Sequence, residues 1–430
     1  MRLAPPPLAI TDTEGFERDT FGSKNAGQRL ASVVTELDGH SVIVLDGDWG
    51  SGKTTFIKQW AGLMRTEHNR GVVYLDAFQM DHHEDAFFVM LAHVLAILDR
   101  QFPEKLADSL IDTAGRVLRA VPGAVTNLAL KKAIPALTGG IISFEDLVMS
   151  HDTPDDWVKA QLEMVENEST SVTKFRTTLT DIVGQSPLNP PLVFIIDELD
   201  RCRPSFALNV LERMKHIFSA DDICFVLVTH LDELAEMVRH AYGIKNPRRY
   251  LQKFYHLRLT IDSVLATSGV TIASKYLQHL SSTTAPEFFK YQGHAMITEM
   301  VTIHALRLRA VERMAIGLVL YERTATGVSK DHAAVLVVGL CVLRTCDTTL
   351  YQKASKGRMT FAEACAFFKF DEWEDQLSAK KSVEAWKDVT VGEPVGGKGP
   401  DPGIRTGGLS RRAVLPDICQ HIDLFWNEEE

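Results

Sequence analysis

The sequence predicts an α/β fold in which a parallel β-sheet is covered by helices on both faces and is followed by a domain built of helices. Five short β-rich runs alternate with helical stretches up to about residue 262, and only helical patterns follow. Strands that alternate with helices form parallel sheets, because each strand returns to the same edge through a crossover helix. The first four runs are almost continuously apolar, as expected of strands that are buried on both faces.

The β-rich runs and the stretches with helical spacing define the expected elements in order. The predicted strands are residues 41–46, 71–77, 192–197, 223–229 and 255–261. The helices predicted between them are residues 54–65, 85–99, 205–219 and 231–242. The long interval between the second and third strands has helical spacing at 106–118 and 155–179, which predicts a helical insertion.

After the fifth strand the apolar spacing is helical throughout, and glycine and proline accumulate from about residue 391. Helices are predicted at residues 264–280, 288–300, 306–321, 331–343 and 361–376. The expected domains are a core at 15–262 with 105–188 as its helical insertion, an α-helical domain at 263–388, and a flexible Gly/Pro-rich loop with the C-terminal segment at 389–430.

Composition and charge exclude several classes of protein. With 45% hydrophobic and 24% charged residues the chain is globular rather than disordered, and its net charge of −10 argues against nucleic-acid binding through bulk charge. A basic group at 245–258 leaves a local nucleic-acid contact open. The 6 scattered cysteines form no CxxC pair, and no signal peptide is recognisable, so a reduced, cytoplasmic setting is expected. Attachment to a membrane is not expected, although the interrupted apolar stretch 117–142 leaves surface contact open.

The motif G-x-x-x-x-G-K-[ST] lies directly after the first predicted strand and opens a predicted helix, the context that identifies a phosphate-binding loop. Its glycines let backbone N–H groups surround phosphates, and the helix presents its positive end. Lys53 places a charge near the β- and γ-phosphates, Thr54 can ligate Mg²⁺, and Thr55 is expected near the α-phosphate. The predicted nucleotide-binding residues of this loop are Gly47, Asp48, Trp49, Gly50, Ser51, Gly52, Lys53, Thr54 and Thr55.

Two acids follow the third predicted strand, Asp197 and Glu198. In P-loop proteins an acid at this place holds Mg²⁺, here together with Thr54, and a second acid polarises the attacking water. Lys53 and Glu198 are therefore predicted catalytic residues, and Thr54 and Asp197 predicted metal-binding residues. No Asn-Lys-x-Asp run is present to recognise guanine, so ATP with Mg²⁺ is the predicted ligand.

The residues around both motifs resemble the KAP family of P-loop NTPases. The resemblance is carried by the segments 19–26, 45–56 with Trp49 inside the loop, 74–78, 197–204, 211–215, 224–228, 250–254 and 306–313. It covers about residues 15–320, and it implies a RecA/AAA-like core with strand order 5-1-4-3-2 and a following α-helical domain. Many members of the family carry a pair of transmembrane helices between the two motifs. The insertion of this chain does not have the sequence pattern of two transmembrane helices, so a soluble form is expected.

The family resemblance also suggests residues that sense the γ-phosphate. The fourth strand ends at Thr229 and His230, where the family pattern leads one to expect an acid or amide, so either residue takes that role or His230 is structural. By the resemblance, Arg309 could fold back from the helical domain as a catalytic arginine; the alternative is a surface salt bridge with Glu312. Other candidate arginines are Arg201, Arg203, Arg248, Arg249 and Arg313. An arginine that acts across a subunit boundary would require a homo-oligomer.

The predicted function is an ATP-binding and ATP-hydrolysing conformational switch. The resemblance suggests a bacterial setting such as defence against phage, beside a partner effector protein. The alternatives are a scaffold or peripheral membrane-organising protein that binds ATP with little or no turnover, and a small-molecule kinase. An intact Glu198 argues against the scaffold, and the acidic pair with the large helical domain argues against the kinase.

Overall fold

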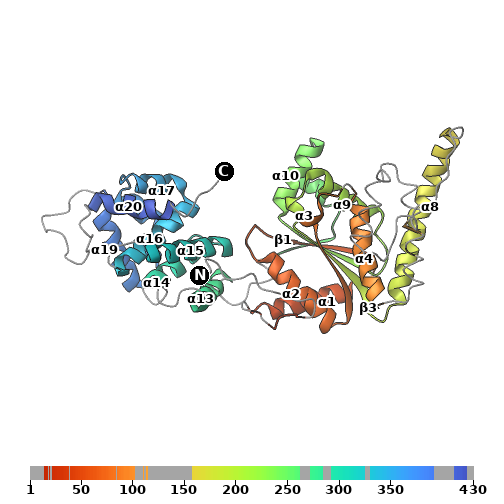
Figure 1. The fold of residues 1–430 in the computed structure, drawn as a ribbon, viewed down its shortest axis with the longest axis horizontal. Helices are drawn as coiled ribbons and strands as arrows, with labels where there is room; N and C mark the ends of the chain where they lie inside the picture. Colours follow the sequence, from red (N-terminus) through yellow and green to blue (C-terminus); the bar gives the residue numbers. More distant parts are fainter. Residues whose placement is uncertain are drawn as a thin grey trace. The chain divides into compact units, whose positions relative to one another are not determined.

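The structure is a computed structural model that describes residues 14–101, 110, 113–114, 157–261, 272–283, 292–324, 330–391 and 411–423, except for residues 18, 20, 21, 38 and 84. The chain divides into two compact units. One is Ile10–Leu265, which contains the sheet, and the other is Ala266–Glu430 together with Met1–Ala9, which is helical over its described residues. Figure 1 labels the elements of both units.

The sheet of the first unit has five parallel strands in the order β2-β3-β4-β1-β5. This confirms the predicted α/β class and the strand order implied by the family resemblance, which is the same order counted from the other edge. Every residue of the central strands β1 and β4 is buried, which explains their continuous apolar sequence. The strands are β1 (Ser41–Asp46), β2 (Arg70–Asp76), β3 (Asn189–Asp197), β4 (Ile223–Thr229) and β5 (Leu257–Thr260).

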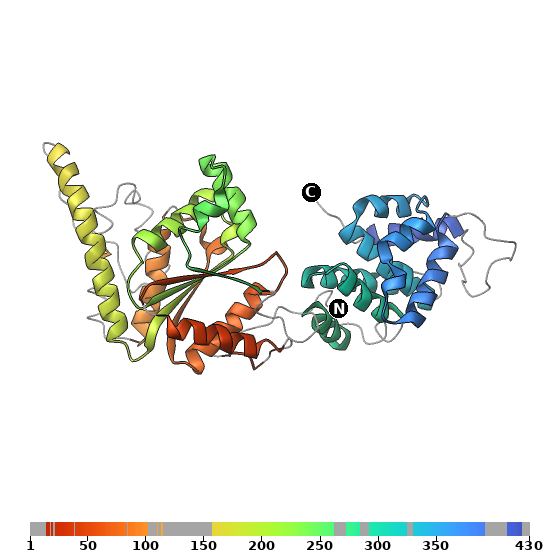
Figure 2. The same cartoon turned by 180° about the vertical axis from the view of Figure 1, so that it is seen from behind.

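Helices cover both faces of this sheet. Figures 1 and 2 show α1 and α2 on one side of the strands and α4, α9 and α10 on the other. The apolar residues of α4, α9 and α10 join one continuous core with β2, β3 and β4. These helices are α1 (Lys24–Glu36), α2 (Lys53–Thr66), α4 (Ala86–Gln101), α9 (Pro204–His216) and α10 (Leu231–Tyr242), and α8 (Trp157–Gly184) precedes β3.

The strand order brings three loop regions together at the carboxyl edge of the sheet. The phosphate loop follows β1, the two acids end β3, and β4, which lies between these strands, ends at Thr229. Asp46 pairs in register with Thr229, and Asp197 with Val228, so the three strand ends are level. Ligands bind outside the carboxyl ends of parallel strands in such sheets.

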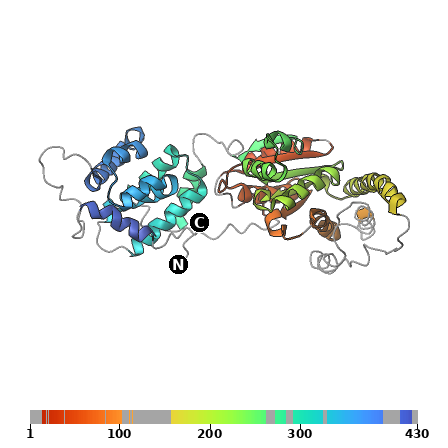
Figure 3. The same ribbon diagram turned by 90° about the horizontal axis from the view of Figure 1, so that it is seen from above.

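The second unit is built mainly of helices over its described residues, as the view in Figure 3 shows. They pack around a separate apolar core in which α16 is central, with Val335, Leu336 and Leu340 fully or almost fully buried. The helices are α13 (Ile272–Thr283), α14 (Gln292–Ile303), α15 (Leu308–Thr324), α16 (Lys330–Cys346), α17 (Thr348–Ser355), α18 (Phe361–Phe368), α19 (Gln376–Val389) and α20 (Arg411–Asp423).

Two features of this unit differ from the expectation. The helix predicted at 361–376 ends at Phe368, because Lys369 adopts a left-handed conformation with φ 47, and α19 starts later where Asp375 caps it. The C-terminal segment, for which the apolar spacing predicted no helix, contains α20, whose Val414, Leu415 and Ile418 are buried in the core. Pro416 lies inside this helix, where a proline interrupts the usual helical pattern.

Much of the predicted insertion at 105–188 lies outside the described residues, including most of the helix expected at 106–118 and all of the apolar stretch 117–142. The helix expected at 155–179 is present as α8. Within the described part of the chain, no helix combines the length and the apolar character that crossing a bilayer requires.

Candidate nucleotide-binding site

The loop from Gly47 to Gly52 joins β1 to α2, and its backbone depends on glycine at several places. Gly50 and Gly52 have φ of 76 and 90, a region that L side chains rarely adopt. A Cβ atom on Gly47 would lie 2.5 Å from Cγ2 of Ile261. A tight, glycine-dependent loop of this kind can direct backbone N–H groups at a phosphate, with the N-terminus of α2 behind them.

Lys53 is the first residue of α2 and is only 9% exposed. Its ammonium donates to the carbonyl oxygens of Gly47 at 2.5 Å and Asp48 at 2.9 Å, and so lies across the loop. Burial lowers the pKa of Lys53, and nearby carboxylates, foremost that of Asp200, oppose this effect. A buried ammonium in this position can transfer its hydrogen bonds to phosphate oxygens, which are stronger acceptors than carbonyls.

Asp197, the last residue of β3, is 1% exposed. Burial raises its pKa to about 6, although hydrogen bonds to the carboxylate favour the ionised form. The hydroxyl of Tyr74 donates to one carboxylate oxygen at 2.8 Å, and the backbone N–H of Glu198 donates to the other at 2.9 Å. These two donors fix the orientation of the carboxylate.

Glu198 has a left-handed backbone with φ 60 and ψ 30, which turns its side chain back toward the phosphate loop. One carboxylate oxygen accepts from the hydroxyl of Thr54 at 3.3 Å, and the other pairs with Nε of Arg201 at 2.5 Å. The hydroxyl of Thr54 and the carboxylates of Asp197 and Glu198 thus meet at one point. An all-oxygen set of this kind suits Mg²⁺, which prefers hard ligands and keeps part of its water shell.

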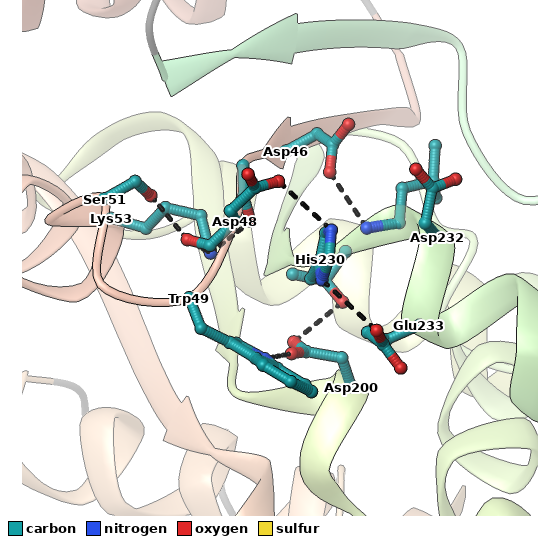
Figure 4. A network of polar contacts seen from close by, with 12 residues as sticks. Asp46, Asp48, Trp49, Ser51, Lys53, Asp200, His230, Asp232 and Glu233 are labelled. Atoms are coloured by element: carbon teal, nitrogen blue, oxygen red, sulfur yellow. Dashed lines mark hydrogen bonds and ion pairs between the residues drawn. The ribbon is translucent and has the colours of Figure 1, made fainter. Parts of the chain in front are cut away.

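A network of polar contacts joins the phosphate loop to the end of β4, as Figure 4 shows. The indole N–H of Trp49 donates to Asp200 at 2.6 Å, and the hydroxyl of Thr229 donates to the other oxygen of the same carboxylate at 3.0 Å. His230 lies 3.2 Å from a carboxylate oxygen of Asp48, and its ring meets that of Trp49 edge to face. The side chains of Asp48 and Trp49 in the phosphate loop therefore contact residues that follow β4 and β3, respectively.

The comparison with protein families agrees with this geometry. A family model described as the KAP family P-loop domain matches residues 24–324, more than half of the chain. The chain belongs to the KAP family of P-loop NTPases. A search of curated proteins found the phage T7 exclusion protein of Escherichia coli (strain K12), 23% identical over 270 residues. The alignment covers 57% of this chain and 33% of that protein, so the chain spans about a third of its relative's length.

Three of the six candidate arginines form ion pairs with carboxylates of the KAP domain itself. Arg201 pairs with Glu198, Arg203 with Asp81, and Arg248 with Asp232. Arg309 lies near the start of α15 in the helical unit and is exposed, so its predicted role in catalysis stays a prediction. Thr229, predicted to sense the γ-phosphate, donates the hydrogen of its hydroxyl to the carboxylate of Asp200.

Three residues of the KAP site were not predicted to act there. Tyr74 orients Asp197, Asp200 binds both Trp49 and Thr229, and Arg258 on β5 donates to Asp46 at the end of β1. Asp46 in turn accepts the N–H that opens α10. The polar side chains at the ends of otherwise apolar strands were the available signal, but their partners come from strands that are distant in sequence.

Proposed function

We propose that this chain binds ATP with Mg²⁺ at the phosphate loop, hydrolyses it, and uses the nucleotide as a conformational switch. The observation that carries the proposal is the 3.3 Å contact between the hydroxyl of Thr54 and the carboxylate of Glu198, beside the buried Asp197. Segments that are far apart in the sequence meet there, which supports the proposal because phosphoryl transfer to water needs a phosphate loop, a metal-binding acid and a water-positioning residue at one place.

Each residue has a separate task in this proposal. Lys53 and the loop N–H groups hold the phosphates and offset their charge. Thr54 and Asp197 would hold Mg²⁺, which would neutralise charge that develops on the phosphate oxygens. Glu198 orients the attacking water and accepts its proton, for which its carboxylate has to give up the hydrogen bond to Thr54. Trp49, Ser51 and Thr55 complete the proposed binding site.

The test compares the wild type with Lys53→Ala and Glu198→Gln, measuring nucleotide binding by calorimetry and phosphate release without any added acceptor. Lys53→Ala is expected to lose binding, and Glu198→Gln to keep binding while losing turnover by a factor of about 100 or more. The matched controls are Lys24→Ala and Glu67→Gln, which together form an exposed salt bridge on the same unit. Normal turnover by Glu198→Gln would show that the proton acceptor is another group.

The alternative is a nucleotide-binding scaffold with little turnover. The observation that favours it is the ion pair at 2.5 Å between Arg201 and Glu198, because the guanidinium occupies a carboxylate oxygen that would otherwise face the attacking water. In that case wild type and Glu198→Gln would release phosphate equally slowly while both bind ATP. A small-molecule kinase would form ADP only when an acceptor is present, and the phosphoryl group would appear on that acceptor rather than as free phosphate.

We further propose that the chain is the ATPase component of a bacterial defence against phage, working in the cytoplasm with a protein partner and as a homo-oligomer. The support is the name of the Escherichia coli relative, a phage T7 exclusion protein. Phage T7 should form fewer plaques on cells that express the wild type than on cells that express Lys53→Ala. Sedimentation with and without ATP tests the oligomer, and turnover of Arg309→Ala at high and low protein concentration tests an arginine supplied by a neighbouring copy.

A further inference from the structure

Asp200 lies in the 3₁₀ turn Leu199–Arg201 that directly follows the two acids of the site. It is 5% exposed, and its two carboxylate oxygens accept from two different elements. One accepts from the indole of Trp49 in the phosphate loop at 2.6 Å, the other from the hydroxyl of Thr229 at the end of β4 at 3.0 Å. Figure 4 shows the contact between Asp200 and the indole of Trp49.

The chemistry of this contact suits a residue that holds other groups in place. An ionised carboxylate only accepts hydrogen bonds, and both partners of Asp200 are donors. Hydrogen bonds to a charged group are stronger than neutral ones, and burial strengthens them further. Trp49 needs such an anchor, because its side chain is 44% exposed and sits on a loop that relies on glycines.

Asp200 also lies close to the charge that binds phosphate. Among the carboxylates around Lys53 it has the largest effect in offsetting the cost of burying the ammonium. A negative charge this near to a phosphate site opposes phosphate binding by simple Coulomb repulsion. The charge of Asp200 and the hydrogen bonds of Asp200 should therefore affect nucleotide affinity in opposite directions, which makes the two effects separable by substitution.

We propose that Asp200 is a positioning residue that holds the phosphate loop in its binding conformation through Trp49 and aligns the end of β4 with it through Thr229. The inference rests on the proposed nucleotide site and adds a residue to it. It predicts that the hydrogen bonds that Asp200 accepts strengthen nucleotide binding, whereas its negative charge weakens it.

The first experiment compares Asp200→Ala with Asp200→Asn by the dissociation constant for Mg·ADP. Alanine removes both hydrogen bonds and should weaken binding about tenfold, the loss of one good hydrogen bond to a charged group. Asparagine removes the charge but can still accept from Trp49 through its carbonyl and donate to the oxygen of Thr229. It should bind at least as tightly as the wild type. Asp181→Asn, the same chemical change on the exposed side of α8, is the control and should change nothing.

The second experiment is a double-mutant cycle between Trp49→Phe and Asp200→Ala. Trp49→Phe keeps an aromatic ring but lacks the N–H donor, so it should weaken binding of Mg·ADP severalfold. The two substitutions should not add, because each removes the same hydrogen bond. Hydrogen exchange at residues 47–52 should be faster in either variant without a matching fall in melting temperature.

The results separate this inference from the nucleotide proposal. If the wild type and Lys53→Ala bind Mg·ADP equally or not at all, the nucleotide proposal fails. If the wild type binds, Lys53→Ala does not, and both Trp49→Phe and Asp200→Ala bind like the wild type, only the positioning role is wrong. The positioning role would also be wrong if the losses of affinity in the double-mutant cycle added up, or if Asp200→Ala bound Mg·ADP more tightly than the wild type. If Asp200→Ala fails to fold, the other two variants still test the positioning role. Trp49→Phe must weaken the binding of Mg·ADP, and Asp200→Asn must not.

Discussion

At the scale of single residues, Asp197 shows how burial and function conflict at this site. A metal-binding carboxylate has to be ionised, yet Asp197 is 1% exposed and burial raises its pKa to about 6. Tyr74 and the backbone N–H of Glu198 act against that effect by donating to the ionised form. Without a cation, the buried charge of Asp197 therefore destabilises the folded protein, and the Mg²⁺ that we propose for this site would offset that effect.

Asp197→Asn should consequently make the metal-free protein more stable at neutral pH. Because the folded state holds the proton of Asp197 more tightly than the unfolded chain does, ionisation of this group destabilises the fold. The penalty builds up as the pH rises from the ordinary pKa of 3.8 to the folded pKa of about 6, is complete above that value, and is absent only below 3.8. The gain at pH 8 should be up to about 3 kcal/mol and should shrink toward pH 5. Urea unfolding in EDTA at several pH values measures it.

The same substitution should abolish any effect of Mg²⁺ on nucleotide binding. Asp181→Asn, on the exposed side of α8, serves as the control and should show no pH-dependent gain. An Asp197→Asn protein that is less stable than the wild type at pH 8 would mean that the hydrogen bonds to the carboxylate outweigh the cost of burying its charge.

At the scale of elements, α2 connects the phosphate site to the N-terminal part of the unit. Its first residue is Lys53, and further along, Gly62 packs directly against the backbone of Glu14. A Cβ atom on Gly62 would lie 1.9 Å from the carbonyl oxygen of Glu14, a position that no side chain can occupy without moving backbone. The glycine lowers helix propensity but permits this close approach.

Gly62→Ala should therefore destabilise the unit, although alanine is the better helix former. Displaced backbone is expected to cost about 1–3 kcal/mol, more than the roughly 1 kcal/mol that helix propensity returns. Gly184→Ala is the matched control, because a Cβ atom added there, at the end of α8, would meet nothing within 4 Å, and it should be neutral or slightly stabilising. Thermal unfolding followed by circular dichroism compares the two; equal melting temperatures would refute the close packing at Gly62.

At the scale of the whole molecule, the chain has two compact units, each with its own apolar core. The nucleotide site described above lies entirely within Ile10–Leu265, whereas Arg309 belongs to the other unit. A switch that acts on the helical unit needs nucleotide-dependent contacts between units, and the exposed Arg309 is the residue that the family resemblance suggests for them.

Calorimetry should resolve two unfolding transitions, because units with separate cores unfold as separate cooperative blocks. Mg·ADP at one hundred times its dissociation constant should stabilise only the unit that binds it, by about 2.7 kcal/mol, which shifts that transition by several degrees. Gly62→Ala identifies the transition, since it should lower the same one. Lys53→Ala should abolish the shift, and a single transition that moves as a whole would show that the units unfold together.

The sequence by itself determined the class of the fold, all five strands of the sheet to within a few residues, and the two motifs of the site. These features are local, since a buried strand, a glycine-rich turn and a helix start are each encoded by neighbouring residues. The strand order came from the family resemblance, and the structure confirms it. The pattern failed at Lys369 and at α20, where one residue in a left-handed conformation and one proline inside a helix interrupt the expected spacing.

Only the tertiary structure decided which side chains act on each other across the site. Tyr74 and Asp197 are 123 residues apart, and Trp49 and Asp200 are 151 apart, yet each pair shares a hydrogen bond. Parallel strands place residues side by side according to strand order and register, and no local pattern in the sequence records either one. For that reason the sequence named Lys53, Thr54, Asp197 and Glu198, whereas the residues that hold them in place emerged only from the folded sheet.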